Sequence, residues 1–397
     1  MKRIRITVNN SKKFSFGDSF FSVGSCFSEN AAKYLSSFGV KTFSNPFGTV
    51  YNPYSVYQQF LHITEKEKYN ADDLSFYNEK FFLFCHSALD DSTDRIAVLN
   101  AANSRLITAK DFFAQSGVFL VTLGSAVVYE ADSAAFGIPG IHEKIITANC
   151  HRVPQSKMAR RVLTHAECCT YINKIIETVT AAKPDANIIL TVSPARHYPG
   201  EPLLDSVSKA RLKSATEQVL ENYDSKQFFY FPAYEIFRDE LCDRKWYKND
   251  AAHPNKKAVS FIMKRFIETS FTDEVECTMN EIAAIRQLLR HRPSSANGIA
   301  NYELLKKISS RLENIKFADT QTLRFETSCR IAENFYNDKE SGSLIEKLLP
   351  ESDKKAFIFD LMAYFRHERS FESLPTQLFS DKRLSYMLIS FLTKNSV

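Results

Sequence analysis

The chain has 397 residues, a formal net charge of +5 at pH 7 and 44% hydrophobic residues, a proportion that supports a sizeable core and excludes global disorder. Lysine and arginine are scattered along the chain, so the charge gives no indication of a nucleic-acid partner. No apolar run approaches the length of a membrane span, and the first residues lack the apolar core of a signal peptide. The eight cysteines include no Cys-x-x-Cys spacing, so we expect reduced thiols in a cytoplasmic protein.

Residues 20–39 carry the first strong pattern. The apolar run 20–23 predicts a buried strand, the triplet Gly24, Ser25 and Cys26 follows at the expected turn, and apolar residues then recur at helical spacing. A strand, a tight turn with a small nucleophilic side chain and a helix form the layout of a nucleophile elbow. Because a helix N-terminus favours an anion, we expect a thiol at this position to be partly ionised.

Apolar strand runs then alternate with amphipathic segments, which predicts an α/β protein with a mostly parallel sheet. The expected strands lie at 118–123, 187–192 and 228–231, and the expected helices begin after 164 and span 206–223 and 255–271. Polar candidates for ligand contact follow these strands or occupy loops: Gly48, Ser125, Asn149, His151 and Arg196. Because open α/β sheets bind ligands at the carboxyl ends of their strands, we expect all of these except His151 to share one pocket with Cys26.

A second pattern stands near the end of the α/β region, where Asp250 and His253 lie three residues apart just before Pro254. A carboxylate at this spacing steadies an imidazole that faces outward as a base. The pair therefore predicts a general base, with Asp250 orienting His253.

Taken together, these motifs resemble the GSCFA family, which is named for its Gly-Ser-Cys-Phe run and placed near the SGNH (GDSL) hydrolases. The run itself is residues 24–27, and further matches in chain order are 44–48 (Ser-Asn-Pro-Phe-Gly), 122–125 (Thr-Leu-Gly-Ser), 148–154 (Ala-Asn-Cys-His-Arg-Val-Pro) and 193–197 (Ser-Pro-Ala-Arg-His). The resemblance implies a three-layer, SGNH-hydrolase-like (flavodoxin-like) fold. We expect this catalytic domain at residues 1–290, and the helical spacing beyond it predicts an all-helical accessory domain at 300–397.

The resemblance also implies roles for single residues. In the Gly-Asp-Ser frame of SGNH enzymes the third residue is the nucleophile, which places Cys26 there and leaves Ser25 as the alternative after a one-residue slip. Gly48 resembles the glycine whose amide binds the oxyanion, although an ordinary turn glycine is an equal reading. The usual Gly-x-Asn-Asp of SGNH enzymes is missing after the strand at 118–123, so Ser125 or Asn149 is the expected substitute.

Two further residues are expected to contact the substrate. The family match favours His151, together with Asn149, and Arg196 suits a carboxylate or phosphate. The predicted function is an acyl-ester hydrolase or an O-acyltransferase with a covalent acyl-enzyme, acting on a carbohydrate or a small acylated metabolite. The alternative is a non-catalytic ligand-binding or protein-binding protein that kept the fold. No resident cofactor or metal is expected, because the histidines show no His-x-x-x-His spacing, and acyl-CoA is a candidate acyl donor.

Overall fold

The structure is a computed structural model that describes residues 4–8, 10, 12–88, 91–132, 136, 144–148, 150–291, 298–316, 318–350 and 353–395. The chain divides into two compact units, Met1–Asp273 and Glu274–Val397. This division falls one helix before the boundary expected from the sequence, because helix α8 (Asp273–Arg290) pairs with the helices that follow it, for example through the Arg311–Glu281 ion pair.

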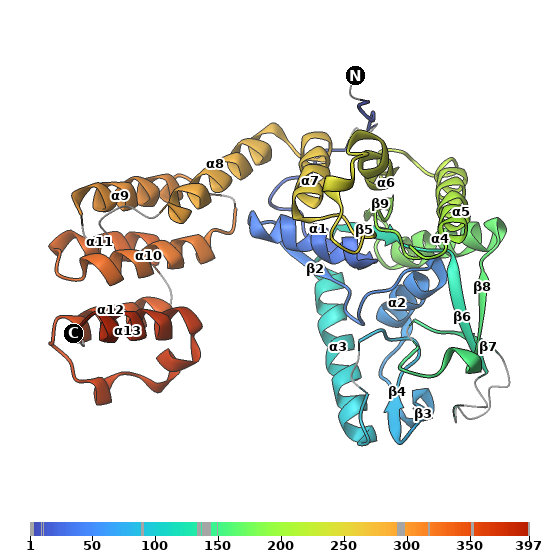
Figure 1. Cartoon of the computed structure of the whole chain (residues 1–397), viewed down its shortest axis with the longest axis horizontal. Helices are drawn as coiled ribbons and strands as arrows, with labels where there is room; N and C mark the ends of the chain where they lie inside the picture. The colour runs from blue at the N-terminus through green and yellow to red at the C-terminus, as the bar shows by residue number, and fades with distance from the viewer. Residues whose placement is uncertain are drawn as a thin grey trace. The chain divides into compact units, whose positions relative to one another are not determined.

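A five-stranded parallel sheet forms the centre of the first unit (Figure 1). Its order is β2-β1-β5-β9-β10, and numbered along the chain this is 2-1-3-4-5, the flavodoxin-type order of doubly wound sheets. The strands are β1 (Phe20–Gly24), β2 (Thr42–Ser44), β5 (Val118–Leu123), β9 (Asn187–Val192) and β10 (Phe228–Tyr230). The mostly parallel central sheet predicted from the sequence is therefore confirmed.

Helices cover both faces of this sheet. Phe21 of β1 points into a core shared with α2–α5, and the adjacent Phe20 points to the opposite face, where its ring stacks 5.6 Å from that of Phe271. On that face α1 packs with α7. The helices are α1 (Cys26–Ser37), α2 (Pro53–Glu65), α3 (Arg95–Gln115), α4 (His165–Ala182), α5 (Pro202–Leu220), α6 (Ala233–Glu235), followed by a π turn (Ile236–Glu240), and α7 (Lys256–Ser270).

Two small antiparallel sheets, which the sequence did not predict, extend the loops on the ligand side. One is the hairpin β3 (Ser75–Tyr77) and β4 (Lys80–Phe82). The other has the order β7-β6-β8 and contains β6 (Val127–Asp132), β7 (Lys144–Ile146) and β8 (Met158–Val162). These strands are partly exposed and mix polar with apolar residues, so they lack the continuous apolar runs that marked β1, β5 and β9.

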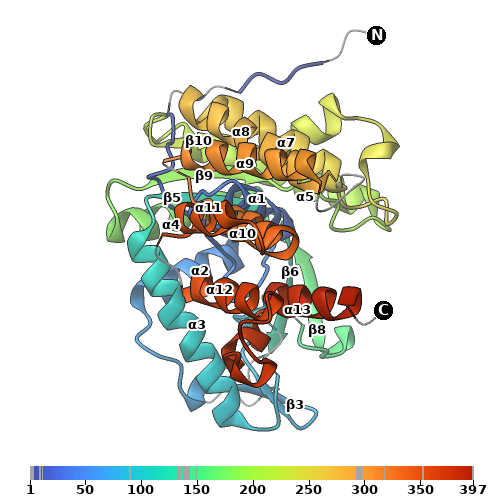
Figure 2. The ribbon, with the colours of Figure 1, turned by 90° about the vertical axis from the view of Figure 1, so that its left-hand side faces the viewer.

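The second unit is helical throughout its described residues, as expected for the C-terminal part of the chain. Besides α8 it contains α9 (Ile299–Glu313), α10 (Gln321–Phe335), α11 (Lys339–Leu348), α12 (Asp353–Phe365) and α13 (Lys382–Asn395). These last five helices lie side by side in both views (Figures 1 and 2), with α10 packed on α9, α11, α12 and α13. Among the described residues of the whole chain, no helix is long and apolar enough to cross a bilayer.

Candidate active site

The turn after β1 is as tight as a nucleophile elbow requires. Gly24 has a φ of 135°, and a Cβ there would lie 2.0 Å from the carbonyl oxygen of Thr122 in β5. The amide of Ser25 donates to that same carbonyl over 3.0 Å. Only glycine allows the chain to pass so close to β5 before it enters α1.

The two candidate nucleophiles differ in exposure and in hydrogen bonding. Ser25 is fully buried, and its hydroxyl accepts a hydrogen bond from the Phe27 amide as the N-cap of α1. Cys26 is the first residue of α1 and is partly exposed, so the elbow presents the thiol and not the hydroxyl. Its own amide is at the helix end, where N–H groups have no intrahelical acceptor.

The thiol of Cys26 is not ionised in advance, which corrects the expectation from the sequence. Burial raises the pKa of Cys26, and Glu29 adds to this effect, while the charges of Lys248 and Lys209 oppose it. Desolvation thus outweighs the attraction of the two lysines. The thiol needs a base before it can attack.

The loop before α7 forms the expected carboxylate–imidazole pair. Asp250 Oδ2 lies 2.8 Å from His253 Nδ1, and Asp250 Oδ1 accepts the amides of Ala252 and His253, each over 2.9 Å. These bonds, led by that from the His253 amide, lower the pKa of Asp250 to about 2. The carboxylate therefore stays ionised and holds Nδ1, so that Nε2 is the ring nitrogen of His253 outside this pair.

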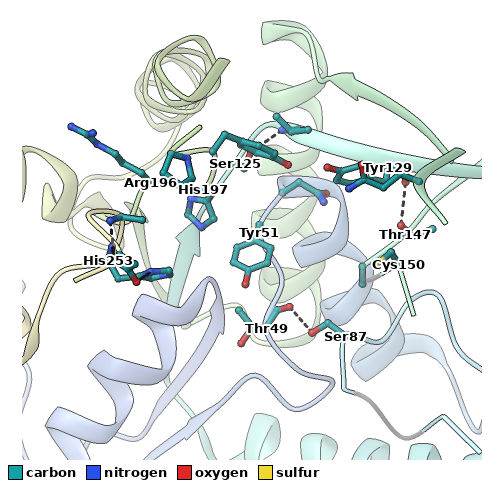
Figure 3. Close-up of a pocket in the computed structure, with 18 residues that line it drawn as sticks. Thr49, Tyr51, Ser87, Ser125, Tyr129, Thr147, Cys150, Arg196, His197 and His253 are labelled. Atoms are coloured by element: carbon teal, nitrogen blue, oxygen red, sulfur yellow. Dashed lines mark hydrogen bonds and ion pairs between the residues drawn. The ribbon is translucent and has the colours of Figure 1, made fainter. Parts of the chain in front are cut away.

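A cavity of about 710 Å³ opens at the carboxyl edge of the sheet, and both members of this pair line it. Figure 3 shows Arg196, His197 and His253 on one side of it and Tyr129, Thr147 and Cys150 on the other, with Tyr51 between them. The lining residues are Thr49, Tyr51, Asn52, Ser87, Ser125, Val127, Tyr129, Thr147, Ala148, Cys150, Gln155, Arg196, His197, Tyr198, Pro199, Asp250, Ala252 and His253. Hydroxyl groups of tyrosine, threonine and serine side chains are among its polar groups, beside an arginine, two histidines and a carboxylate.

The structure brings only part of the predicted set to this cavity. Four of the predicted residues line it: Ser125, Arg196, Asp250 and His253. Cys26 is not in the lining, but it lies close to the lining residue Tyr51, whose pKa is raised first by burial and then by a thiolate at Cys26. Gly48 adjoins the lining residue Thr49, and Asn149 lies outside the described residues.

Gly48 was predicted to bind the oxyanion through its amide and Ser125 through its amide or its hydroxyl, and these groups are already engaged within the fold. The Gly48 amide donates to the Asn45 carbonyl over 2.9 Å, and the Ser125 amide donates to the Tyr51 carbonyl over 2.9 Å. Ser125 Oγ lies 3.1 Å from the Ser208 hydroxyl and is buried. Both residues thus hold loops of the site in place, and neither presents its amide to a ligand in this conformation.

His151 stands apart from the cavity. Its Nδ1 lies 2.7 Å from Asp91 Oδ1 and its Nε2 lies 2.9 Å from the His86 carbonyl, while the ring stacks on Phe82 at 4.7 Å. The residue is buried, and both ring nitrogens face acceptors of the protein itself. This arrangement tethers the loops and leaves no ring nitrogen for the predicted substrate contact.

Two residues that the sequence did not assign to the site lie at or just behind it: His197 lines the cavity, and Lys209 is buried next to His197. Lys209 of α5 is almost completely buried and donates to the carbonyls of Gly124 (2.7 Å) and Ser193 (2.8 Å), at the ends of β5 and β9. Its Nζ lies 3.4 Å from Nδ1 of His197, whose Nε2 is buried without a partner among the described residues. Burial lowers the pKa of Lys209 to about 7 and holds that of His197 well below its usual range.

The sequence offered one signal for each of these residues. His197 ends the Ser-Pro-Ala-Arg-His motif directly after β9, where ligand-side residues are expected. Lys209 lies in the helix predicted at 206–223 from the apolar residues Val207, Ala210, Val219 and Leu220. Of these Val219 is buried, but Val207 is 38% exposed, and the buried face also carries Ser208, Lys209 and Leu212. The sequence signal for Lys209 was its position next to Ser208 on a helix that connects two strands of the sheet, where a polar residue can face the strand ends. Among the described residues, no cluster of three or more histidine, cysteine and acidic side chains has the arrangement of a metal site.

Comparison with known proteins agrees with the motifs. The model of the GSCFA family matches residues 19–266, which is more than half of the chain, and the chain therefore belongs to the GSCFA family. The match covers the elbow, the whole central sheet and the Asp250–His253 loop. No curated protein and no solved structure matches the chain.

Proposed function

We propose that this protein is an SGNH-like acyl-transferring enzyme, an ester hydrolase or an O-acyltransferase, in which Cys26 carries the acyl group. One observation carries the proposal: the thiol-bearing turn at the start of α1 and the Asp250–His253 pair stand at the same carboxyl edge of one parallel sheet. The flavodoxin-type strand order supports the SGNH-like reading of the fold.

The chemistry follows from the two groups. His253 Nε2 takes the proton of the Cys26 thiol as the sulfur attacks the acyl carbonyl. The bond from the carbonyl to the leaving oxygen or sulfur breaks, and the leaving group takes the proton back from His253. Water or an acceptor hydroxyl then attacks the thioester, and His253 accepts its proton and returns it to the thiolate as the new acid or ester leaves.

The cavity supports a small polar substrate. Hydroxyl groups of its mixed lining fit a carbohydrate or a similar small metabolite, and Arg196 stands exposed at its edge with its guanidinium 5.5 Å from the centre of the Tyr247 ring. The Cys26 amide, at the open end of α1, is the donor that we expect to bind the oxyanion in place of Gly48 and Ser125.

The test is detection of the acyl adduct by intact-protein mass spectrometry, with peptide mapping, after exposure to short-chain activated esters and to acetyl-CoA. We expect wild type to gain one acyl group on Cys26. Cys26→Ala and His253→Ala should lose it, and the double variant should lose little more because the two residues act as a unit. Cys277→Ala, which removes an exposed thiol of α8, is the matched control and should keep the adduct. An adduct that survives in Cys26→Ala and disappears in Ser25→Ala would place the nucleophile at Ser25.

One observation favours the second candidate, a non-catalytic binding protein. The amides of Gly48 and Ser125 are both engaged within the fold, so the expected oxyanion hole is not preformed by them. Absence of any adduct in wild type, together with saturable binding of an acylated carbohydrate in the cavity, would favour this function over catalysis.

A further inference from the structure

A second, smaller cavity of about 250 Å³ adjoins the main one. The two share Arg196, Tyr198 and Pro199 in their walls, and the smaller one continues along α5 to the π turn Ile236–Glu240. Pockets for whole small ligands measure about 300–1,000 Å³. The side cavity therefore suits one group of a ligand whose remainder occupies the main cavity.

Two arginines from separate elements line this side cavity, and aromatic rings hold both. The guanidinium of Arg196 lies 5.5 Å from the centre of the Tyr247 ring. That of Arg238 lies 5.8 Å from the centre of the Tyr234 ring and donates to the Tyr234 hydroxyl over 2.5 Å. Neither arginine forms an ion pair with a carboxylate of the described residues, so both retain donors for a ligand.

The acidic groups near these arginines do not neutralise them. Asp205 is the acidic residue in the lining, but it is buried and its Oδ1 accepts the amides of His197 and Tyr198. Glu235 is paired with Lys213 at 2.9 Å, and Asp239 lies beside Arg238 on the outer surface. The exposed charge that faces the side cavity is positive.

We propose that this side cavity, the arginine annex, binds a phosphate group of the substrate. Guanidinium forks pair with oxyanions through parallel hydrogen bonds. A phosphate has enough oxygens to meet forks from two sides, whereas one fork occupies both oxygens of a carboxylate. The inference rests on the proposed function in one respect: the phosphate belongs to the acyl donor, as in acyl-CoA, or to the acceptor, as in a sugar phosphate.

The chain contains its own reporter for this site. Cys242 is an exposed thiol in the lining of the annex, so a bound phosphate should slow its alkylation by N-ethylmaleimide. Cys277 is also exposed but lies on α8 in the second unit, and it serves as the internal control in every sample. Peptide mass spectrometry reads both sites in the full-length protein.

The probes are acetyl-CoA, ADP and glucose 6-phosphate, with adenosine and glucose as their unphosphorylated controls. We expect at least one phosphorylated probe to protect Cys242 and not Cys277. The nucleotide probes and the sugar phosphate distinguish the two sources of the phosphate. Arg238→Gln should raise the concentration for half-protection at least about tenfold, and Arg244→Gln, which alters an exposed arginine outside the lining, should leave it unchanged.

Three results would overturn the proposal that the annex binds phosphate: no protection of Cys242 by any phosphorylated probe, equal protection by adenosine or glucose, or protection that Arg238→Gln leaves intact. Failure of the proposed function is detected by a different measurement, the absence of an acyl adduct on Cys26 in the mass spectrometry test. A protein that protects Cys242 but forms no adduct would keep the annex as the phosphate site of a binding protein.

Discussion

The buried side chain of Lys209 should make the stability of the first unit depend on pH, which unfolding measurements at two pH values can test. Lys209 has lost its contact with water, and its pKa falls from 10.5 to about 7 because burial outweighs the attraction of nearby acidic groups, chiefly Asp205. In the unfolded chain the amine keeps its ordinary pKa. Folding therefore releases a proton from this lysine at every pH between the two values, and the first unit gains stability as the pH rises through that window.

The size of the effect follows from the two pKa values. Linkage predicts that Lys209 alone adds about 1.4 kcal/mol to the free energy of unfolding between pH 6 and pH 8. Lys209→Met should remove this increment. The absolute stability of the variant is a poorer readout, because methionine also leaves the carbonyls of Gly124 and Ser193 without their donor.

The assay is urea unfolding at pH 6 and pH 8, followed by the fluorescence of Trp246, the single tryptophan of the chain and a residue of the first unit. Lys213→Met is the matched control, since Lys213 lies on the same helix but is partly exposed and paired with Glu235, and it should keep the wild-type difference between the two pH values. If Lys209→Met also keeps that difference to within about 0.3 kcal/mol, the lysine is not neutralised by folding and the reasoning is wrong.

Three further predictions concern the elbow and the base. Asp250→Asn should slow acylation by an activated ester on the order of 10³-fold. The Asn amide would donate to Nδ1 of His253, and the imidazole proton would then sit on Nε2, which could no longer accept the proton of the thiol. An unchanged rate in stopped-flow assays would exclude the Asp250–His253 pair as the base. Gly24→Ala should destabilise the first unit by about 3 kcal/mol or more in the urea assay, because its Cβ would meet the Thr122 carbonyl, and an unaltered midpoint would contradict the tight turn. Ser25→Ala should cost about 1 kcal/mol as a lost N-cap, while acylation continues at a comparable rate.

The local signals in the sequence predicted the elements that rest on local interactions. The apolar run of β1, the turn at Gly24 and the amphipathic pattern of α1 involve neighbours within a few residues, and the structure confirms all three. The Asp250–His253 contact is local as well, so its spacing was enough to predict it. The parallel sheet followed from the alternation of apolar strands with helices, because only crossover connections join such strands.

The composition of the site was decided by contacts between distant parts of the chain. The amides of Gly48 and Ser125 point to internal acceptors, and the Ser125 amide meets the Tyr51 carbonyl on another loop. Burial also reversed the expected pKa shift of the Cys26 thiol, since desolvation depends on everything that packs around the sulfur.

Lys209 shows the same limit most clearly. An apolar pattern finds the buried face of a helix only where the core is apolar, and the buried face of α5 is polar next to the site. There the ends of β5 and β9 present two carbonyls that need a donor, and the ammonium group of a lysine meets that need. The sequence by itself determined the parallel central sheet, the turn at Gly24 and the Asp250–His253 contact, because these rest on local patterns. The tertiary structure decided the two small antiparallel sheets and which polar groups line the cavity, because burial and long-range hydrogen bonds exist only once the chain is folded.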